Sequence, residues 1–367
     1  MQKGIVMKKI VFCIVFTALM LLPILQAASI ASNGHSNESD RPVIGVILPF
    51  SPAFADIAQE QKNAIEMALF ETGNNVDIIF KAEQGDPASA IRAFNELAGT
   101  TRRPVAIITA SSWSSNAIHP LAAKEDIFHI AIASAILNRS HPNHTVRLTL
   151  DGKIEEQQLA KYLSQFNRIA VFNMDNDYGN NWARIINDTF KDKIVASIAY
   201  DPQGSDFGPQ LAVIKKENPD AMVLLSARNA SRIAKQAREM GITAQFVGTR
   251  PIERPDLLNE PAIDGLVYTY PSHSFKHHMI GEYEKRHGTP PTFFGIEAYD
   301  AFSTLIGALK AKTNSPETLF AQYAGSSWTG ALGEFRFDEN GDAAYPYMYK
   351  QVTNGKFEVA DFPGIRF

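Results

Sequence analysis

The sequence predicts an α/β protein of two units, each a mostly parallel sheet covered by helices on both faces. Short continuous apolar runs alternate with longer amphipathic stretches, first from Val43 onward and again after Asp151. The chain of 367 residues is long enough for two core-forming domains. Its composition, 45% hydrophobic and 20% charged, fits a globular protein and excludes a collagen-like or wholly disordered chain.

The first unit is predicted over residues 42–148. Asp86-Pro87 marks a helix start, because the carboxylate caps the helix and the proline fits its first turn. Strands are expected at 43–48, 76–80, 105–109 and 127–133, and helices at 54–70, from 86 onward and at 114–124.

The second unit, residues 149–270, repeats this rhythm. Helices are expected at 154–164, 178–191, 206–217 and 230–240, and strands at 168–173, 194–200, 221–225 and 245–248. The rest holds a strand and two helices between 265 and 310 and short strands between 333 and 357, too little for a third unit. We therefore expect it to divide between the first two units, so that several chain crossings form a hinge.

The first 31 residues have the pattern of a secretory signal peptide. Three lysines precede an apolar run at 10–25, which is short for a membrane span, and small residues follow it. Cleavage after Ala27 and cleavage after Ala31 both fit, and an uncleaved anchor is the alternative. Cys13 lies inside the apolar run, unlike a lipoprotein acylation site, so the mature protein is expected to have no cysteine.

The net charge excludes nucleic acid as an expected partner. It is formally −4 at pH 7, and cleavage after Ala31 removes three lysines and no acid, which makes it −7. Such a chain has no excess of the cations that neutralise phosphates.

The sequence contains no standard hydrolase, nucleotide-binding or metalloprotease motif, so we expect neither an enzyme nor a cofactor. A pair of catalytic carboxylates brought together only by the fold stays open at this point. His273 and His277 lie one helical turn apart with His278 beside them, a spacing that suits a metal, although a solvated helix face is the simpler interpretation. The acidic turn 338–342 lacks the calcium-loop pattern, so no metal site is predicted.

Polar residues gather where predicted strands end, which is where doubly wound sheets bind ligands. Ser111 and Ser112 follow one strand and start a helix, so their hydroxyl and N–H groups suit a carboxylate; ordinary helix capping is the alternative. Ser134 follows the next strand in the same way. In the second unit, residues 175–179 combine acids with Tyr178. An ammonium group facing these acids, with its carboxylate on the serine loop, would make the ligand an amino acid.

Taken in order, these segments resemble the type I periplasmic binding proteins, in the branch of the leucine/isoleucine/valine-binding proteins of ABC transporters. The similarity spans nearly all of residues 42–355. It is carried by VIGVILPFS (43–51), FADIAQE (54–60), AIITASS (106–112), VRLTLD (146–151), RIAVFNMDNDYG (168–179), YDPQGSDF (200–207), GIEAYD (295–300) and GEFRFDENG (333–341).

The resemblance implies two Rossmann-like lobes joined by a three-crossing hinge, with residues 42–148 plus 271–330 in the N-terminal lobe and 149–270 plus 331–367 in the C-terminal lobe. It implies an exported, monomeric protein of the periplasm that passes an amino acid or related carboxylate to an ABC transporter permease in the inner membrane. The ligand would lie between the lobes, against Ser111, Ser112, Trp113, Ala133, Ser134, Asp151, Tyr178, Thr249 and Tyr299.

The sequence departs from this family pattern in ways that bear on the ligand. Thr109-Ala110 replaces the Gly-Pro that precedes the serine loop, and no acid that would pair with an α-amino group is evident near 249–250. Bulky Trp113, with Arg228 or Arg250, makes an acid-bearing or aromatic ligand as fitting as leucine. Two further functions stay open: a ligand sensor for a membrane receptor, and a structural paralogue of the cell envelope without a ligand.

Overall fold

The computed structural model describes residues 41–73, 75–132, 142–149, 152–272, 276–309 and 314–362. The expected signal peptide and three expected ligand-binding residues, Ala133, Ser134 and Asp151, lie outside these ranges. Residues 43–367 form one compact unit, which is described below. In the described ranges, no helix combines the length and apolar character that crossing a membrane requires.

The first sheet has the strand order β2-β1-β3-β4-β5, and all of its neighbouring strands are parallel. Its strands are β1 (Val43–Pro49), β2 (Asp77–Glu83), β3 (Ala106–Thr109), β4 (Phe128–Ala131) and β5 (Thr145–Arg147). The helices associated with it are α2 (Ala55–Glu71), α3 (Pro87–Ala98), α4 (Ser112–Lys124), α9 (His278–His287), α10 (Phe293–Ala308) and α11 (Pro316–Tyr323), with the 3₁₀ helix η2 (Pro142–His144) before β5.

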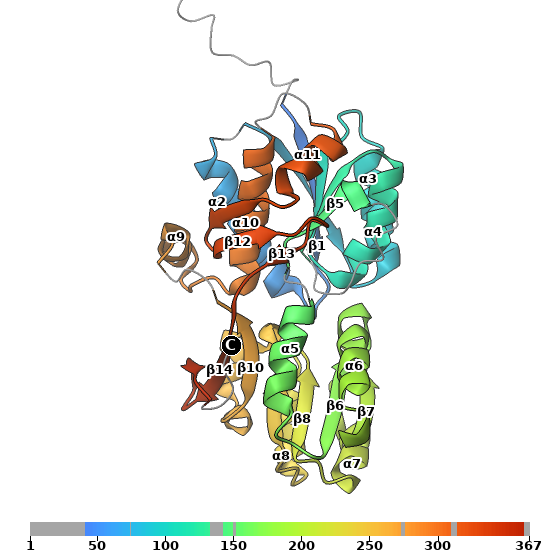
Figure 1. Ribbon diagram of the computed structural model, residues 1–367, viewed down its shortest axis with the longest axis vertical. Helices are drawn as coiled ribbons and strands as arrows, with labels where there is room; N and C mark the ends of the chain where they lie inside the picture. The colour runs from blue at the N-terminus through green and yellow to red at the C-terminus, as the bar shows by residue number, and fades with distance from the viewer. Residues whose placement is uncertain are drawn as a thin grey trace, which may run out of the picture. The chain divides into compact units, whose positions relative to one another are not determined.

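Side chains of β1 alternate between the two faces of this sheet. Val46 and Leu48 belong to the large core that includes α2 and α10, whereas Ile47 packs with α3 and α4. Figure 1 shows α3 and α4 together on one side of the sheet, and α2 with α10 on the other. Burial on both faces explains why these strands read as continuous apolar runs.

The second sheet has the order β15-β14-β10-β9-β8-β6-β7 and is parallel from β10 to β7. Its strands are β6 (Ile169–Met174), β7 (Ile194–Tyr200), β8 (Ala221–Leu225), β9 (Gln245–Gly248), β10 (Val267–Pro271), β14 (Tyr347–Thr353) and β15 (Lys356–Ala360). The helices are α5 (Gly152–Leu163), α6 (Asp177–Thr189), α7 (Gly208–Lys216) and α8 (Ala230–Glu239), with the 3₁₀ helices η3 (Lys191–Lys193), η4 (Arg250–Ile252), η5 (Pro255–Asn259) and η6 (Pro261–Ile263).

A small third sheet, β11 (Ser327–Gly330), β12 (Gly333–Phe337) and β13 (Ala343–Ala344), lies beside the first. Arg147 of β5 forms a β-bridge with Asp342, and its Nε donates to Asp342 Oδ1 at 2.9 Å. The carboxylate of Asp300 on α10 accepts the N–H groups of Ala331 and Leu332. The chain therefore returns to the second sheet only at β14, whereas the family resemblance places this crossing near residue 330.

Candidate ligand-binding site

A small cavity of about 80 Å³ lies between the loops that follow the carboxyl ends of strands in both large sheets. This is the edge at which doubly wound sheets bind ligands. The cavity is lined by Pro49, Phe54, Ile57, Ala110, Ser111, Ser112, Trp113, Ile132, Thr149, Met174, Tyr178, Ala227, Arg250, Pro251, Phe294 and Glu297. Most of these side chains are apolar, and the polar ones come from loops and helix ends and from α10.

Trp113 forms a fixed wall of the cavity. Its indole Nε1 donates a 2.7 Å hydrogen bond to Oε1 of Glu83, and its ring lies 5.1 Å from that of Phe54, centroid to centroid. Burial raises the pKa of Glu83, while hydrogen bonds from Gly85, Trp113 and others act in the opposite direction. The tryptophan is therefore held before any ligand arrives, which reduces the entropy lost on binding.

The serine loop places the N-terminus of α4 at the cavity wall. The Ser111 side chain caps the helix by accepting from the Ser114 N–H, and its hydroxyl lies 2.5 Å from the Ser114 hydroxyl. Ser112 is the first residue of the helix and is buried. The Ser111 hydroxyl is thus engaged in capping, and the attraction for an anion comes from the positively polarised helix end.

Tyr178 reaches the cavity from α6, and Thr249 holds it there. The Tyr178 hydroxyl and Thr249 Oγ1 are 2.5 Å apart, and burial raises the pKa of Tyr178. Gly179 makes this placement possible, because a Cβ at that position would collide with the carbonyl oxygen of Met174. Thr249 is fully buried behind the tyrosine and does not line the cavity.

A buried ion pair lies at the polar end of the cavity. Arg250 Nη1 is 2.7 Å from Glu155 Oε2, and both residues are almost completely buried. Glu155 also accepts hydrogen bonds from the hydroxyls of Thr269 and Tyr347, at 2.8 and 3.2 Å. Burial acts to lower the pKa of Arg250, but the acidic side chains around it, Glu155 first and then Tyr347, Glu297 and Tyr178, together outweigh burial and raise the pKa.

Glu297, on α10, is 1% exposed and faces the same end of the cavity. Burial raises the pKa of its carboxyl to about 7, although the Arg250 cation acts to lower it. The Thr149 hydroxyl, which lies near the carboxyl without a well-aligned hydrogen bond, acts in the same direction as Arg250. Near this pH, Glu297 is therefore a group that can either donate or only accept a hydrogen bond, depending on its proton.

Polar atoms without partners converge on this end of the cavity. Among the described residues, Arg250 Nε, Thr149 Oγ1 and Glu297 Oε1 are buried and form no hydrogen bond of good geometry. Buried polar groups are rarely left in this way, because each costs roughly 1–3 kcal/mol. A cation donor, a hydroxyl and a carboxyl oxygen are thus available to a bound molecule.

A second, larger hollow of about 1320 Å³ adjoins the cavity, since both include Ile57 and Phe294 in their walls. Its lining is rich in charged side chains from both halves of the molecule. Within it, Asp56 of α2 pairs with Arg254 and lies 3.5 Å from Arg228 Nη2. These contacts join the first-sheet helix α2 to loops of the second sheet.

The structure brings four of the predicted ligand-binding residues to the cavity: Ser111, Ser112, Trp113 and Tyr178. Tyr299 is placed elsewhere, with its hydroxyl donating to Glu71 of α2, and it does not line the cavity. On the same helix, Glu297 faces the cavity instead, because residues two apart in an α-helix point in roughly opposite directions. The sequence signal for Glu297 was a carboxylate in a strongly apolar helix, a signal that it shares with Asp300 of the same helix.

The histidines that the sequence offered for a metal do not form a cluster with other metal ligands in the described ranges. The rings of His277 and His278 lie against each other with centroids 4.4 Å apart and planes tilted by 38°, and His278 Nε2 lies 3.0 Å from one carboxylate, that of Glu71. His273 lies outside the described residues.

The sequence profile of the periplasmic binding proteins matches residues 43–356 of the chain. An extracellular ligand binding receptor from Desulfohalobium retbaense is 50% identical, with a TM-score of 0.86, over 88% of this chain and 60% of that one. The chain thus spans 60% of that receptor's length. Among curated proteins, none matches the chain.

Two more distant structures share the fold. The leucine binding protein LivK from Thermotoga maritima is 22% identical, with a TM-score of 0.79, over 87% of this chain and 98% of that one. A solute binding protein of an ABC transporter from Rhodopseudomonas palustris, in complex with 3,4-dihydroxy benzoic acid, is 22% identical, with a TM-score of 0.78, over 88% and 96%. The two-sheet α/β architecture predicted from the sequence is that of these proteins.

Proposed function

Because the chain belongs to the periplasmic binding protein family, we propose that it captures a small carboxylate ligand in the cavity and delivers it to an ABC transporter permease. The observation that carries this proposal is the cavity's polar end, where buried donor and acceptor atoms have no partner within the described part of the chain. A ligand that supplies those partners gains the hydrogen bonds that the empty protein lacks.

The arrangement fits an amino acid with an apolar side chain best. Its carboxylate would lie against the N-terminus of α4 and Arg250 Nε, and its ammonium group would donate to Glu297 Oε1 and Thr149 Oγ1. The side chain would occupy the apolar part of the cavity, beside Trp113. LivK, with the same fold, is a leucine binding protein, which supports this class of ligand.

An aromatic carboxylate without an amine is the second candidate. Arg250 is a cation at the cavity, and Phe54, Trp113 and Phe294 supply flat apolar surfaces. The Rhodopseudomonas palustris protein with 3,4-dihydroxy benzoic acid has the same fold. In this case Glu297 would keep its proton and donate a hydrogen bond to the ligand.

Delivery requires the cavity to open. At about 80 Å³ it is far smaller than the roughly 300–1,000 Å³ of pockets for drug-sized ligands, so a leucine-sized molecule enters only when the two halves separate. Binding without chemical change then suits a transport role. We further propose export to the periplasm through cleavage of the first 31 residues, which N-terminal sequencing of the protein from a periplasmic fraction tests.

Matched pairs of ligands test the proposed function by thermal shift and calorimetry. Each amino acid is compared with its analogue lacking the amine, such as leucine with 4-methylpentanoate and phenylalanine with 3-phenylpropanoate. A ligand at 100 times its Kd stabilises the fold by about 2.7 kcal/mol. Glu297→Gln should weaken the binding of the amino acid more than that of the analogue without the amine. If no carboxylate of either class binds, the proposal is wrong.

A further inference from the structure

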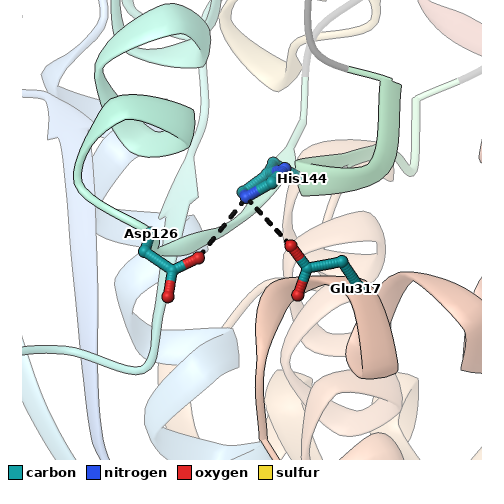
Figure 2. A group of neighbouring side chains, drawn as sticks. All are labelled: Asp126, His144 and Glu317. Atoms are coloured by element: carbon teal, nitrogen blue, oxygen red, sulfur yellow. Dashed lines mark ion pairs between the residues drawn. The ribbon is translucent and has the colours of Figure 1, made fainter.

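Three metal-ligating side chains converge on one point of the first-sheet half, well apart in sequence. Asp126 precedes β4, His144 ends the 3₁₀ helix η2, and Glu317 lies in the first turn of α11. Figure 2 shows His144 Nε2 directed between the two carboxylates. One ligand atom from each residue lies within 4.8 Å of the other two. None of the three lines the ligand cavity.

The distances in this cluster suit a metal better than direct hydrogen bonds. His144 Nε2 is 3.5 Å from Asp126 Oδ1 and 3.6 Å from Glu317 Oε1. An N–H···O hydrogen bond would be about 2.7–3.2 Å long. Two ligand atoms that share a tetrahedral zinc ion, at bonds of about 2.1 Å, lie roughly 3.4 Å apart. The observed separations are close to that value.

A neighbouring serine holds the Glu317 carboxylate of the cluster in place. Ser315 Oγ donates to Glu317 Oε2 at 3.0 Å, which leaves Oε1 directed at His144. Such outer hydrogen bonds are typical of metal-ligating carboxylates. His144 is mostly buried, with 19% of its side chain exposed, whereas Asp126 and Glu317 are 74% and 56% exposed, so an ion reaches the cluster from solvent.

We propose that Asp126, His144 and Glu317 form a binding site for a divalent transition metal of the zinc class, with water as the fourth ligand. One imidazole and two carboxylates are ligands that zinc accepts, and an open fourth position is common where protein supplies three. The ion also cancels the repulsion between two neighbouring carboxylates. Because α11 contacts η2, β4 and β5, the bound metal would fasten this helix to the edge of the first sheet.

The test is zinc titration of the untagged full-length protein against a chromophoric chelator. We expect one zinc ion per chain, and His144→Ala should weaken binding at least about 100-fold, since even outer-shell changes cost 10–100-fold. His278→Ala is the matched control, because its imidazole pairs with one carboxylate only. Equal zinc affinity in His144→Ala and the parent, or no stoichiometric binding by the parent, overturns the proposal.

Two further measurements separate metal loss from misfolding, and a third tests the coordination geometry. Asp126→Asn and Glu317→Gln keep the shape of each side chain and should also weaken the binding of zinc. Zinc should raise the melting temperature of the parent, and it should leave that of His144→Ala unchanged. Cobalt in place of zinc should give the intense visible absorption of a four-coordinate ion. A weak six-coordinate spectrum contradicts the predicted geometry.

Discussion

Arg250 and Glu155 form a buried ion pair at the wall of the cavity, with Arg250 Nη1 2.7 Å from Glu155 Oε2 and no partner for Arg250 Nε among the residues that the structure describes. The pair joins a loop after β9 to helix α5, ninety-five positions earlier in the chain. It therefore supports the second-sheet half and at the same time presents a donor to the ligand.

Breaking this pair on one side should destabilise the fold strongly. Arg250→Gln or Glu155→Gln alone leaves a buried charge without its counterpart, which costs about 3–5 kcal/mol. The double variant should lose clearly less than the sum of the single losses. Urea denaturation of all four proteins measures this coupling, and additive losses would show that the two side chains do not depend on each other.

The stability contributed by Glu297 should depend on pH. The pKa of the Glu297 carboxyl is about 7 in the folded protein, whereas its ordinary value, which applies to the unfolded chain, is 4.5. As the pH rises from 4.5 to 7, the carboxyl therefore loses its proton in the unfolded chain but keeps it in the folded protein. The folded state is therefore destabilised progressively from about pH 4.5 to 7, by about 3 kcal/mol in all. Because Asp300, with a pKa raised by burial to about 6, adds to the same trend, the test is the difference between the parent and Glu297→Gln. Parallel stability curves would contradict it.

Proton release should accompany the binding of an amino acid below pH 7. An ammonium group against Glu297 Oε1 favours the ionised carboxyl and lowers its pKa, so the proton leaves as the ligand binds. Calorimetry at pH 6 in two buffers of different ionisation enthalpy measures this release. An analogue without the amine should release no proton, and Glu297→Gln should release none with either ligand.

The hydrogen bond between Tyr178 and Thr249 should matter more for stability than its size suggests. Tyr178→Phe leaves the buried Thr249 hydroxyl without its partner, which costs about 1–3 kcal/mol. Adding Thr249→Val removes the unpaired hydroxyl and should recover much of the lost stability. Thermal unfolding compares the three variants with the parent. Tyr178→Ala is a poorer test of ligand binding, because Tyr178 is buried in the main core and its loss would disturb the fold.

The contact of Asp56 with Arg254 and Arg228 should favour the closed arrangement. Asp56→Asn weakens this link between α2 and the second-sheet loops, so we expect a larger radius of gyration without ligand and a faster ligand off-rate. Glu66→Gln on the same helix is the control, since the one ion pair of Glu66 among the described residues is with Lys62, also on α2. Small-angle scattering measures the radius of gyration of both variants without ligand. If the two variants scatter alike, this ion pair does not hold the halves together.

Sequence patterns predicted the strands well because burial on both faces makes each one a continuous apolar run, as in β1 and β8. They also located the serine loop and Tyr178, which lie immediately after strands. They missed Thr149 and Glu297, since these reach the cavity only through the way that β5 and α10 are placed in the fold. Spatial pairing of this kind leaves no periodic signal.

The boundary of the last crossing was harder to predict for a related reason. Short antiparallel strands such as β12 and β14 look alike in sequence, and only partners far away decide their sheet. Hydrogen bonds from the N–H groups of residues 331–332 to Asp300 hold this segment against α10, and the pairing of Asp342 with Arg147 holds the following segment against β5. The strands β14 and β15 then add to β10 in the second sheet.

This threading has a consequence for how the molecule is made. The first sheet lacks α10, α11 and β11–β13 until the chain has been synthesised beyond residue 344, and the second lacks β14 and β15 until 360. The core of the first half is complete only after residue 344 and that of the second only after residue 360, so both depend on strands near the end of the chain. The two halves must therefore fold late and almost simultaneously, through contacts of long sequence separation that make folding slow. Most of the chain has therefore been synthesised before either half can reach its complete fold.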